Sequence, residues 1–156
     1  MAEWELADTW DHAVDGDSAS ADFIGLAGAN EIMVVAEDVT KQTTGLLNLH
    51  LSVDNGDNYR STSGDYEQIV EDGTVVVSVA AANLHVTNAT AARNGAAIVH
   101  AANLSGVLKV IEALNRATAN RVRYFLQSTD PVNACQVKGS GGGNLTGGKI
   151  YCLVRR

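Results

Sequence analysis

The residues best suited to chemistry lie in one polar segment, Asp54 to Tyr66, which follows an amphipathic stretch. Six of its side chains are candidates for contact with a partner: Asp54, Asn55, Asp57, Asn58, Tyr59 and Tyr66. Calcium requires six or more oxygen ligands, and an EF-hand loop places them at alternate positions and ends in a glutamate. Asp54 and Asp57 do not follow that spacing, and no glutamate follows at the required distance. Asn55-Gly56 is typical of a hairpin turn, so we favour a turn over a cation site.

A second segment, GSGGGNLTGG at positions 139–148, has the glycine content of a phosphate-binding loop. A P-loop ends in Gly-Lys-Ser/Thr and opens a helix whose first N–H groups hold the phosphate. Neither feature is present here. We therefore expect a flexible loop, or a backbone packed closely against a partner.

The histidines and cysteines form no catalytic or metal-binding pattern. The four histidines are scattered along the chain, at His12, His50, His85 and His100, and none has a partner at metal-ligand spacing. No nucleophile-elbow motif is present. Cys135 and Cys152 could be neighbours across a pair of strands, and we expect two small buried thiols. We predict no catalytic residue, no metal, no cofactor and no enzyme activity.

The elements that must position these residues are strands. In the stretch before the polar segment, Leu47, Leu49, Leu51 and Val53 alternate with Asn48, His50 and Ser52, which predicts a strand with one buried face. The run 31–37 is apolar on both faces, which is typical of a strand covered on both sides. The run 104–117 fits helical spacing and alternation equally well, and its surroundings favour a strand.

About eight to ten short runs of this kind, separated by turn residues, predict an all-β fold with a single jelly-roll-like sandwich of antiparallel strands. We assign residues 21–156 to this sandwich and residues 1–20 to a polar N-terminal arm that carries Trp4 and Trp10. Two interpretations of the tryptophans stay open. They dock the arm on a neighbouring molecule, or they cap one end of the chain's own core.

Composition narrows the function classes. The chain has 156 residues, of which 46% are hydrophobic and only 19% are charged, with a net charge of −7. A nucleic-acid partner requires clustered cations, so direct nucleic-acid binding is not expected. The N-terminus lacks the pattern of a signal peptide, and no apolar run approaches the length of a membrane span. We expect a soluble protein made in a cytoplasm, with no membrane partner.

The segment Leu46 to Tyr66, LLNLHLSVDNGDNYRSTSGDY, resembles a hairpin that recurs in small β-sandwich modules of tailed-bacteriophage virion proteins. Eight residues carry the resemblance: Leu49, Leu51, Ser52, Asp54, Gly56, Tyr59, Gly64 and Tyr66. The last strand resembles the closing strand of such modules through Gly147, Gly148, Ile150 and Tyr151. The resemblance covers roughly Ala21 to Val154, and Arg155-Arg156 replace the glycine that usually closes the module.

The resemblance implies a non-enzymatic structural protein of the virion, assembled in the host bacterial cytoplasm, as a capsid decoration protein, a head fibre or a tail-fibre appendage. Such modules commonly form homo-oligomers, often trimers, and their partners are capsid or tail subunits. Trp4 and Trp10 would then contact a neighbouring subunit, because aromatic anchors bury a large area at small entropic cost.

A second hypothesis comes from a different class of protein, a carbohydrate-binding module that contacts host glycans. Jelly rolls bind sugars through exposed aromatic rings and polar loops. Tyr59, Tyr66 and the turn Asp54–Asn58 would form that site. This hypothesis requires the two tyrosine rings to point outward side by side.

Overall fold

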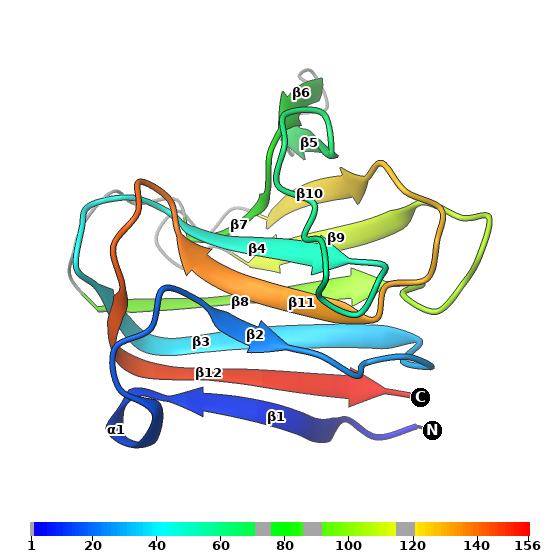
Figure 1. Cartoon of the computed structure of the whole chain (residues 1–156). Helices are drawn as coiled ribbons and strands as arrows, with labels where there is room; N and C mark the ends of the chain where they lie inside the picture. Colours follow the sequence, from blue (N-terminus) through cyan, green and yellow to red (C-terminus); the bar gives the residue numbers. More distant parts are fainter. Residues whose placement is uncertain (1, 71–75, 86–91, 115–120) are drawn as a thin grey trace.

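The computed structural model describes residues 2–70, 76–85, 92–114 and 121–156, which fold as a two-layered β-sandwich (Figure 1). The prediction of an all-β sandwich is confirmed, although the described residues form twelve strands rather than eight to ten. The strands are β1 (Glu5–Asp11), β2 (Ala21–Phe23), β3 (Glu31–Lys41), β4 (Leu47–Ser52), β5 (Tyr66–Val70), β6 (Val76–Val79), β7 (Ala82–His85), β8 (Arg93–His100), β9 (Lys109–Leu114), β10 (Arg121–Leu126), β11 (Ala134–Gly139) and β12 (Leu145–Arg155). A single helical turn, α1 (His12–Asp15), follows β1.

The two sheets have the connectivity of a jelly roll. The larger sheet has the order β1-β12-β3-β8-β9-β10-β5-β6, and the smaller sheet has the order β2-β11-β4-β7. Paired strands are antiparallel, and most neighbours are far apart in sequence, so the chain passes repeatedly between the layers. Strands β9, β10, β5 and β6 continue the larger sheet beyond β8.

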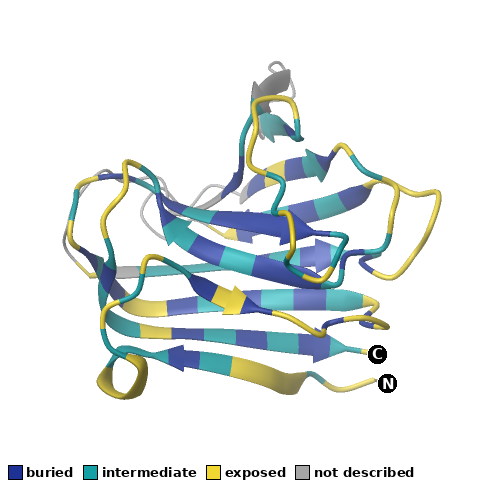
Figure 2. Cartoon of the chain, viewed as in Figure 1, coloured by how far each residue is buried: buried dark blue, intermediate teal, exposed yellow. Residues whose placement is uncertain are grey.

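The core lies between the layers and is formed by alternate residues of each strand (Figure 2). Strand β4 contributes Leu47, Leu49 and Leu51, and β3 and β12 contribute the facing side chains Ile32, Val34, Ala36, Ile150, Cys152 and Val154. Full burial of one such aliphatic side chain stabilises the fold by about 1.5–3 kcal/mol. Both cysteines are buried free thiols, as predicted, and burial together with the neighbouring Cys152 thiol raises the pKa of Cys135.

The polar face predicted for β4 is buried too. His50 and Ser52 are almost inaccessible to solvent, because residues 53–66 fold back over this part of the strand. The Arg60 N–H donates to the Leu51 carbonyl (2.9 Å), which fixes this return. The prediction that β4 has only one buried face is therefore wrong at His50 and Ser52, and His50 is hydrogen-bonded through Nδ1 to the Arg60 carbonyl (3.0 Å).

The N-terminal residues are part of the larger sheet. Strand β1 pairs with β12, with Trp10 opposite Ile150, and the Trp10 side chain is only 6% exposed. Trp10 therefore caps the chain's own core. Trp4 lies partly exposed against Arg155, whose guanidinium carbon is 5.2 Å from the centre of the indole ring.

Two predicted segments differ from expectation in their bounds. The run 104–117 does contain a strand, β9, but it begins at Lys109, and residues 115–117 lie outside the described residues. The glycine-rich loop is shorter than expected, since β11 ends at Gly139 and β12 begins at Leu145. The Leu46 N–H donates to Ser140 Oγ (2.7 Å), so the loop packs against a neighbouring segment of its own chain.

Candidate functional site

The polar turn after β4 is held by its own hydrogen bonds. The buried Ser52 hydroxyl donates to Asp54 Oδ1 (2.6 Å) and accepts from the Gly56 N–H (3.0 Å). The Asp54 carboxylate also accepts from the backbone N–H and the side-chain amide of Asn58 (2.9 and 2.7 Å). Donation first from Ser52 and then from Asn58 lowers the pKa of Asp54 to about 2. These contacts form a tight turn, as predicted, but the turn does not belong to a hairpin, because β4 and β5 lie in different sheets and do not pair.

Asn55 joins this turn to two other loops. Asn55 has a φ of 60° and Gly56 has a φ of 95°, the left-handed conformation that a tight turn requires. The Asn55 N–H donates to Asn133 Oδ1 (2.6 Å), and its side-chain carbonyl accepts from the Gly25 N–H (2.8 Å). Asn55 is exposed but already committed to these bonds, whereas the exposed Asp57 side chain has no hydrogen bond to a described residue.

The two tyrosines do not form a surface pair. The Tyr66 side chain is fully buried, and its hydroxyl accepts from the Leu51 N–H (2.8 Å) and donates to the Arg60 carbonyl (3.3 Å). Tyr59 is half-buried, and burial together with the Asp22 carboxylate raises its pKa. Tyr66 is therefore a core residue, and its assignment to a contact surface is wrong.

The turn makes a testable contribution to acid stability. Because Asp54 has a pKa of about 2 in the folded state and an ordinary value of 3.8, its charged form stabilises the fold above about pH 4. That contribution is lost as the pH falls from 4 towards 2. We expect the free energy of unfolding to fall more steeply over this interval in the wild type than in Asp54→Asn. Urea denaturation at a series of pH values measures the difference. Asp57→Asn is the control. If the free energy of unfolding falls no more steeply in the wild type than in Asp54→Asn, the role assigned to Asp54 is contradicted.

A larger candidate surface lies on the outer face of the eight-stranded sheet. Eight outward residues of its strands are apolar and occupy neighbouring register positions: Leu6, Tyr151, Leu153, Met33, Val35, Ala96, Ile98 and Leu114. Leu6 is 60% exposed and Leu114 is 44% exposed. An antiparallel sheet with one solvated face normally alternates apolar and polar residues. This outer face, named here the apolar sheet face, breaks that rule.

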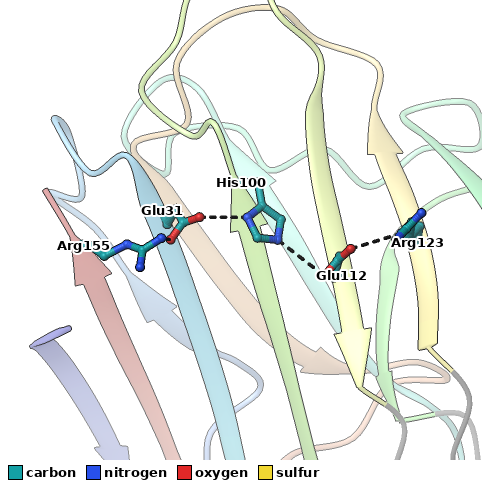
Figure 3. Close-up of polar contacts among 5 residues, drawn as sticks. All are labelled: Glu31, His100, Glu112, Arg123 and Arg155. Carbon is teal, nitrogen blue, oxygen red and sulfur yellow. Dashed lines mark hydrogen bonds and ion pairs between the residues drawn. The ribbon is translucent and has the colours of Figure 1, made fainter. Parts of the chain in front are cut away.

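A row of charged residues borders the apolar sheet face (Figure 3). Arg155 of β12 pairs with Glu31 of β3, whose other carboxylate oxygen lies 2.9 Å from His100 Nδ1 on β8. His100 Nε2 lies 3.6 Å from Glu112 of β9, which pairs with Arg123 Nε of β10 (3.1 Å). The row thus crosses five adjacent strands, with an arginine at each end and a glutamate on each side of His100, and its two arginines balance its two glutamates.

Part of the apolar sheet face could be recognised from the sequence. The run 31–37 is apolar in both phases and predicts a strand covered on both sides, yet in the single chain only the inner face of β3 is covered by the smaller sheet. Residues 149–154 show the same double pattern through Tyr151 and Leu153. The charged row could not be found from sequence, because its members come from five strands whose order depends on the fold.

Within the described ranges, no group of three or more His, Cys, Asp or Glu side chains is placed to hold a metal ion. No helix in the same ranges has both the length and the apolar character needed to cross a membrane. No protein-family model matches the chain, and a search of curated proteins finds no significant match.

Proposed function

We propose that the protein is a non-enzymatic structural subunit of a bacteriophage virion that associates with further copies of itself through the apolar sheet face. The observation that carries this proposal is the block of eight neighbouring apolar side chains on the outer face of β1, β12, β3, β8 and β9. Large exposed apolar patches mark interaction sites in soluble proteins. The family of virion modules that the sequence resembles commonly forms homo-oligomers, so the two lines of support agree.

Six of the residues that carry the resemblance have structural roles in this fold, and these roles support the resemblance. Leu49 and Leu51 are core residues, and the Ser52 hydroxyl, Asp54 and Gly56 build the turn. The buried Tyr66 hydroxyl ties β4 to the returning segment. These residues specify a structural module rather than a catalytic centre.

The apolar sheet face is large enough to form the centre of a contact with a second copy. Strands lie about 4.8 Å apart and outward residues about 6.7 Å apart along a strand, so five strands and two rows cover roughly 320 Å². A specific interface buries about 800 Å² on each partner, and interfaces between identical subunits are the more apolar ones. The apolar sheet face supplies part of this area, and the charged residues around it supply the remainder.

Charge also favours a second copy over a basic partner. The chain carries a net charge of −7, so most of its surface repels another copy. On the apolar sheet face the charges are paired internally, including Lys149 with Asp11 (2.7 Å) beside the patch. Two such faces can approach without bringing unpaired carboxylates together.

Placing a charge at the centre of the face should separate the subunits. Met33 and Ile98 are cross-strand neighbours on β3 and β8, and both point outward. We expect Met33→Glu to weaken self-association by at least about 100-fold, because it buries an unpaired carboxylate at the contact. Sedimentation equilibrium over a range of concentrations measures the change. Val14→Glu, on the 81% exposed side chain of α1, is the control.

Two outcomes would contradict self-association. One is a wild type that is monomeric at every concentration, and the other is an oligomer that Met33→Glu and Ile98→Glu leave intact. The virion assignment has its own test, mass spectrometry of purified particles of the phage that encodes the chain. We expect a fixed copy number per particle, and the absence of the protein from intact particles would contradict a virion role.

A further inference from the structure

We propose that two copies of the chain pack their apolar sheet faces together across a two-fold axis that runs between β3 and β8. This arrangement rests on the proposed self-association and adds the orientation of the second copy and the residues that meet. A contact in which a surface packs against the same surface of a second copy requires a two-fold axis. Such an axis lies in the plane of the contact. When it runs along the strands, it reverses their order in the second copy, so its position decides which strands face each other.

Outward residues form three lines across the strands β12, β3, β8 and β9. The first line contains three members of the charged row, and its residues are Arg155, Glu31, His100 and Val110. The second line consists of Leu153, Met33, Ile98 and Glu112, and the third of Tyr151, Val35, Ala96 and Leu114. Glu112 thus lies one register step from the line of His100, and their side chains approach to 3.6 Å across that step.

An axis between β3 and β8 places apolar residues of one copy on apolar residues of the other. Strand β3 then faces β8 of the second copy, and β12 faces β9. The apolar pairs that meet across the contact are Met33 with Ile98, Val35 with Ala96, and Tyr151 with Leu114. Symmetry repeats each pair on the other side of the axis. The centre of the contact is therefore apolar.

The charged row fits the same axis (Figure 3). On the first line, Glu31 faces His100 of the second copy. Arg155 lies one register step, about 6.7 Å along the strand, from Glu112 of the second copy, and its long side chain can span that step. Each of these carboxylates thus meets a basic side chain of the second copy. Opposite charges that meet at a contact fix its register.

An axis that passes through a strand would instead bring like charges together. An axis through β8 would place Glu31 near Glu112 of the second copy, and Arg155 near Arg123. An axis through β3 would place Glu31 opposite Glu31 of the second copy. Both arrangements add repulsion between carboxylates to a chain whose net charge is already −7. The axis must therefore pass between two strands.

The other axes between strands use less of the apolar sheet face. With the axis between β8 and β9, Met33 would lie opposite Arg123 of the second copy, and the apolar pairs at the centre would be lost. With the axis between β12 and β3, the apolar residues still meet, but only β1, β12, β3 and β8 overlap. The proposed axis adds β9 and β10 to that overlap. A specific interface buries about 800 Å² on each partner, so the larger overlap is favoured.

Charge-reversal variants that are mixed in pairs test the position of the axis. Arg155→Glu and Glu112→Arg should each weaken self-association about tenfold or more, because each brings like charges together at the contact. An equimolar mixture of the two should restore association, since both contacts across the axis then join opposite charges. Sedimentation equilibrium of the variants, alone and mixed, measures the dissociation constants. The wild type should form a dimer and no larger species.

Two further mixtures are controls with the same net charges. Glu31→Arg with Arg123→Glu reports an axis between β8 and β9, and Glu31→Arg with Arg155→Glu reports an axis between β12 and β3. Neither mixture should associate more tightly than its components. Restoration in either control, or its absence in the mixture of Arg155→Glu and Glu112→Arg, would overturn the proposed axis while self-association stands. A monomeric wild type would overturn self-association itself.

A pair of conservative variants gives an independent measurement. None of the four charged side chains is buried, and circular dichroism reports whether each reversal variant is folded. Val35→Cys and Ala96→Cys keep the charges unchanged and place thiols on facing strands of the two copies. After oxidation of the equimolar mixture, we expect the disulfide between positions 35 and 96 of different copies to predominate. Predominance of links between two copies of the same variant would overturn the proposed axis.

Discussion

Replacing Gly148 with alanine should remove a large part of the stability of the fold. Gly148 lies in β12 at a bulge opposite β3 and has a φ of 86°. A Cβ at this position would lie 2.5 Å from the carbonyl oxygens of Glu37 and Asp38, which belong to the backbone of the neighbouring strand. A left-handed alanine costs about 1–2 kcal/mol, and the overlap forces the two central strands apart at about 1–3 kcal/mol more. Small domains have only about 5–15 kcal/mol to lose.

Gly28→Ala separates these two effects. Gly28 has a nearly identical φ of 83°, but a Cβ there would meet nothing within 4 Å. Its substitution should cost only the backbone term. Urea denaturation of both variants measures the difference, and equal losses of stability would show that the contact between β12 and β3 is not tight at Gly148.

Lys109→Met should produce the second large effect. The Lys109 side chain is fully buried at the start of β9, and its ammonium group donates to the carbonyls of Leu104, Val107 (2.6 Å) and Thr129 (3.3 Å). Methionine keeps the volume but removes the donor of the Leu104 and Val107 carbonyls, whereas the Thr129 carbonyl keeps the Gly106 N–H as a second donor. A hydrogen bond to a charged group contributes about 1.5–3 kcal/mol, so we expect a loss of about 3 kcal/mol.

The loss should be concentrated in the loop that Lys109 supports. Hydrogen exchange should accelerate most at Gly106, whose N–H donates to the Thr129 carbonyl (3.0 Å). Lys149→Met, which removes a half-exposed ion pair with Asp11, should leave the stability almost unchanged. A Lys109→Met variant as stable as Lys149→Met would show that water satisfies these carbonyls equally well.

The part of the fold that could be predicted is the part that depends on local sequence patterns. The alternation of leucines in β4 and the apolar run of β3 identified strands correctly, because a period of two depends only on the chain itself. The pairing of residues 5–11 could not be predicted, because their partner strand, β12, lies at the other end of the chain. Trp10 was left between two interpretations for that reason.

The candidate sites were less predictable than the strands. Tyr66 looked like a surface residue because it follows a polar turn, and only the return of the chain over β4 shows that its hydroxyl serves the Leu51 N–H. The tautomer of His50 depends on Arg60, whose carbonyl accepts a hydrogen bond from Nδ1, and the sequence does not indicate this contact. One groove on the smaller sheet is lined by residues of β4, β11 and the turn 140–144, and no sequence pattern indicates that these segments meet.

The position of β3 has a consequence for the order of events during folding. Ile32 pairs with Val99 on one side and with Val154 on the other, so β3 emerges from the ribosome long before either neighbour exists. Pairing between distant segments loses a large amount of conformational entropy on loop closure, so such pairs form slowly. Until β8 arrives, both hydrogen-bonding edges of β3 are open, and the second edge stays open until β12 arrives. We therefore expect refolding in the millisecond-to-second range, and nascent chains that depend on chaperones until the last strand is in place.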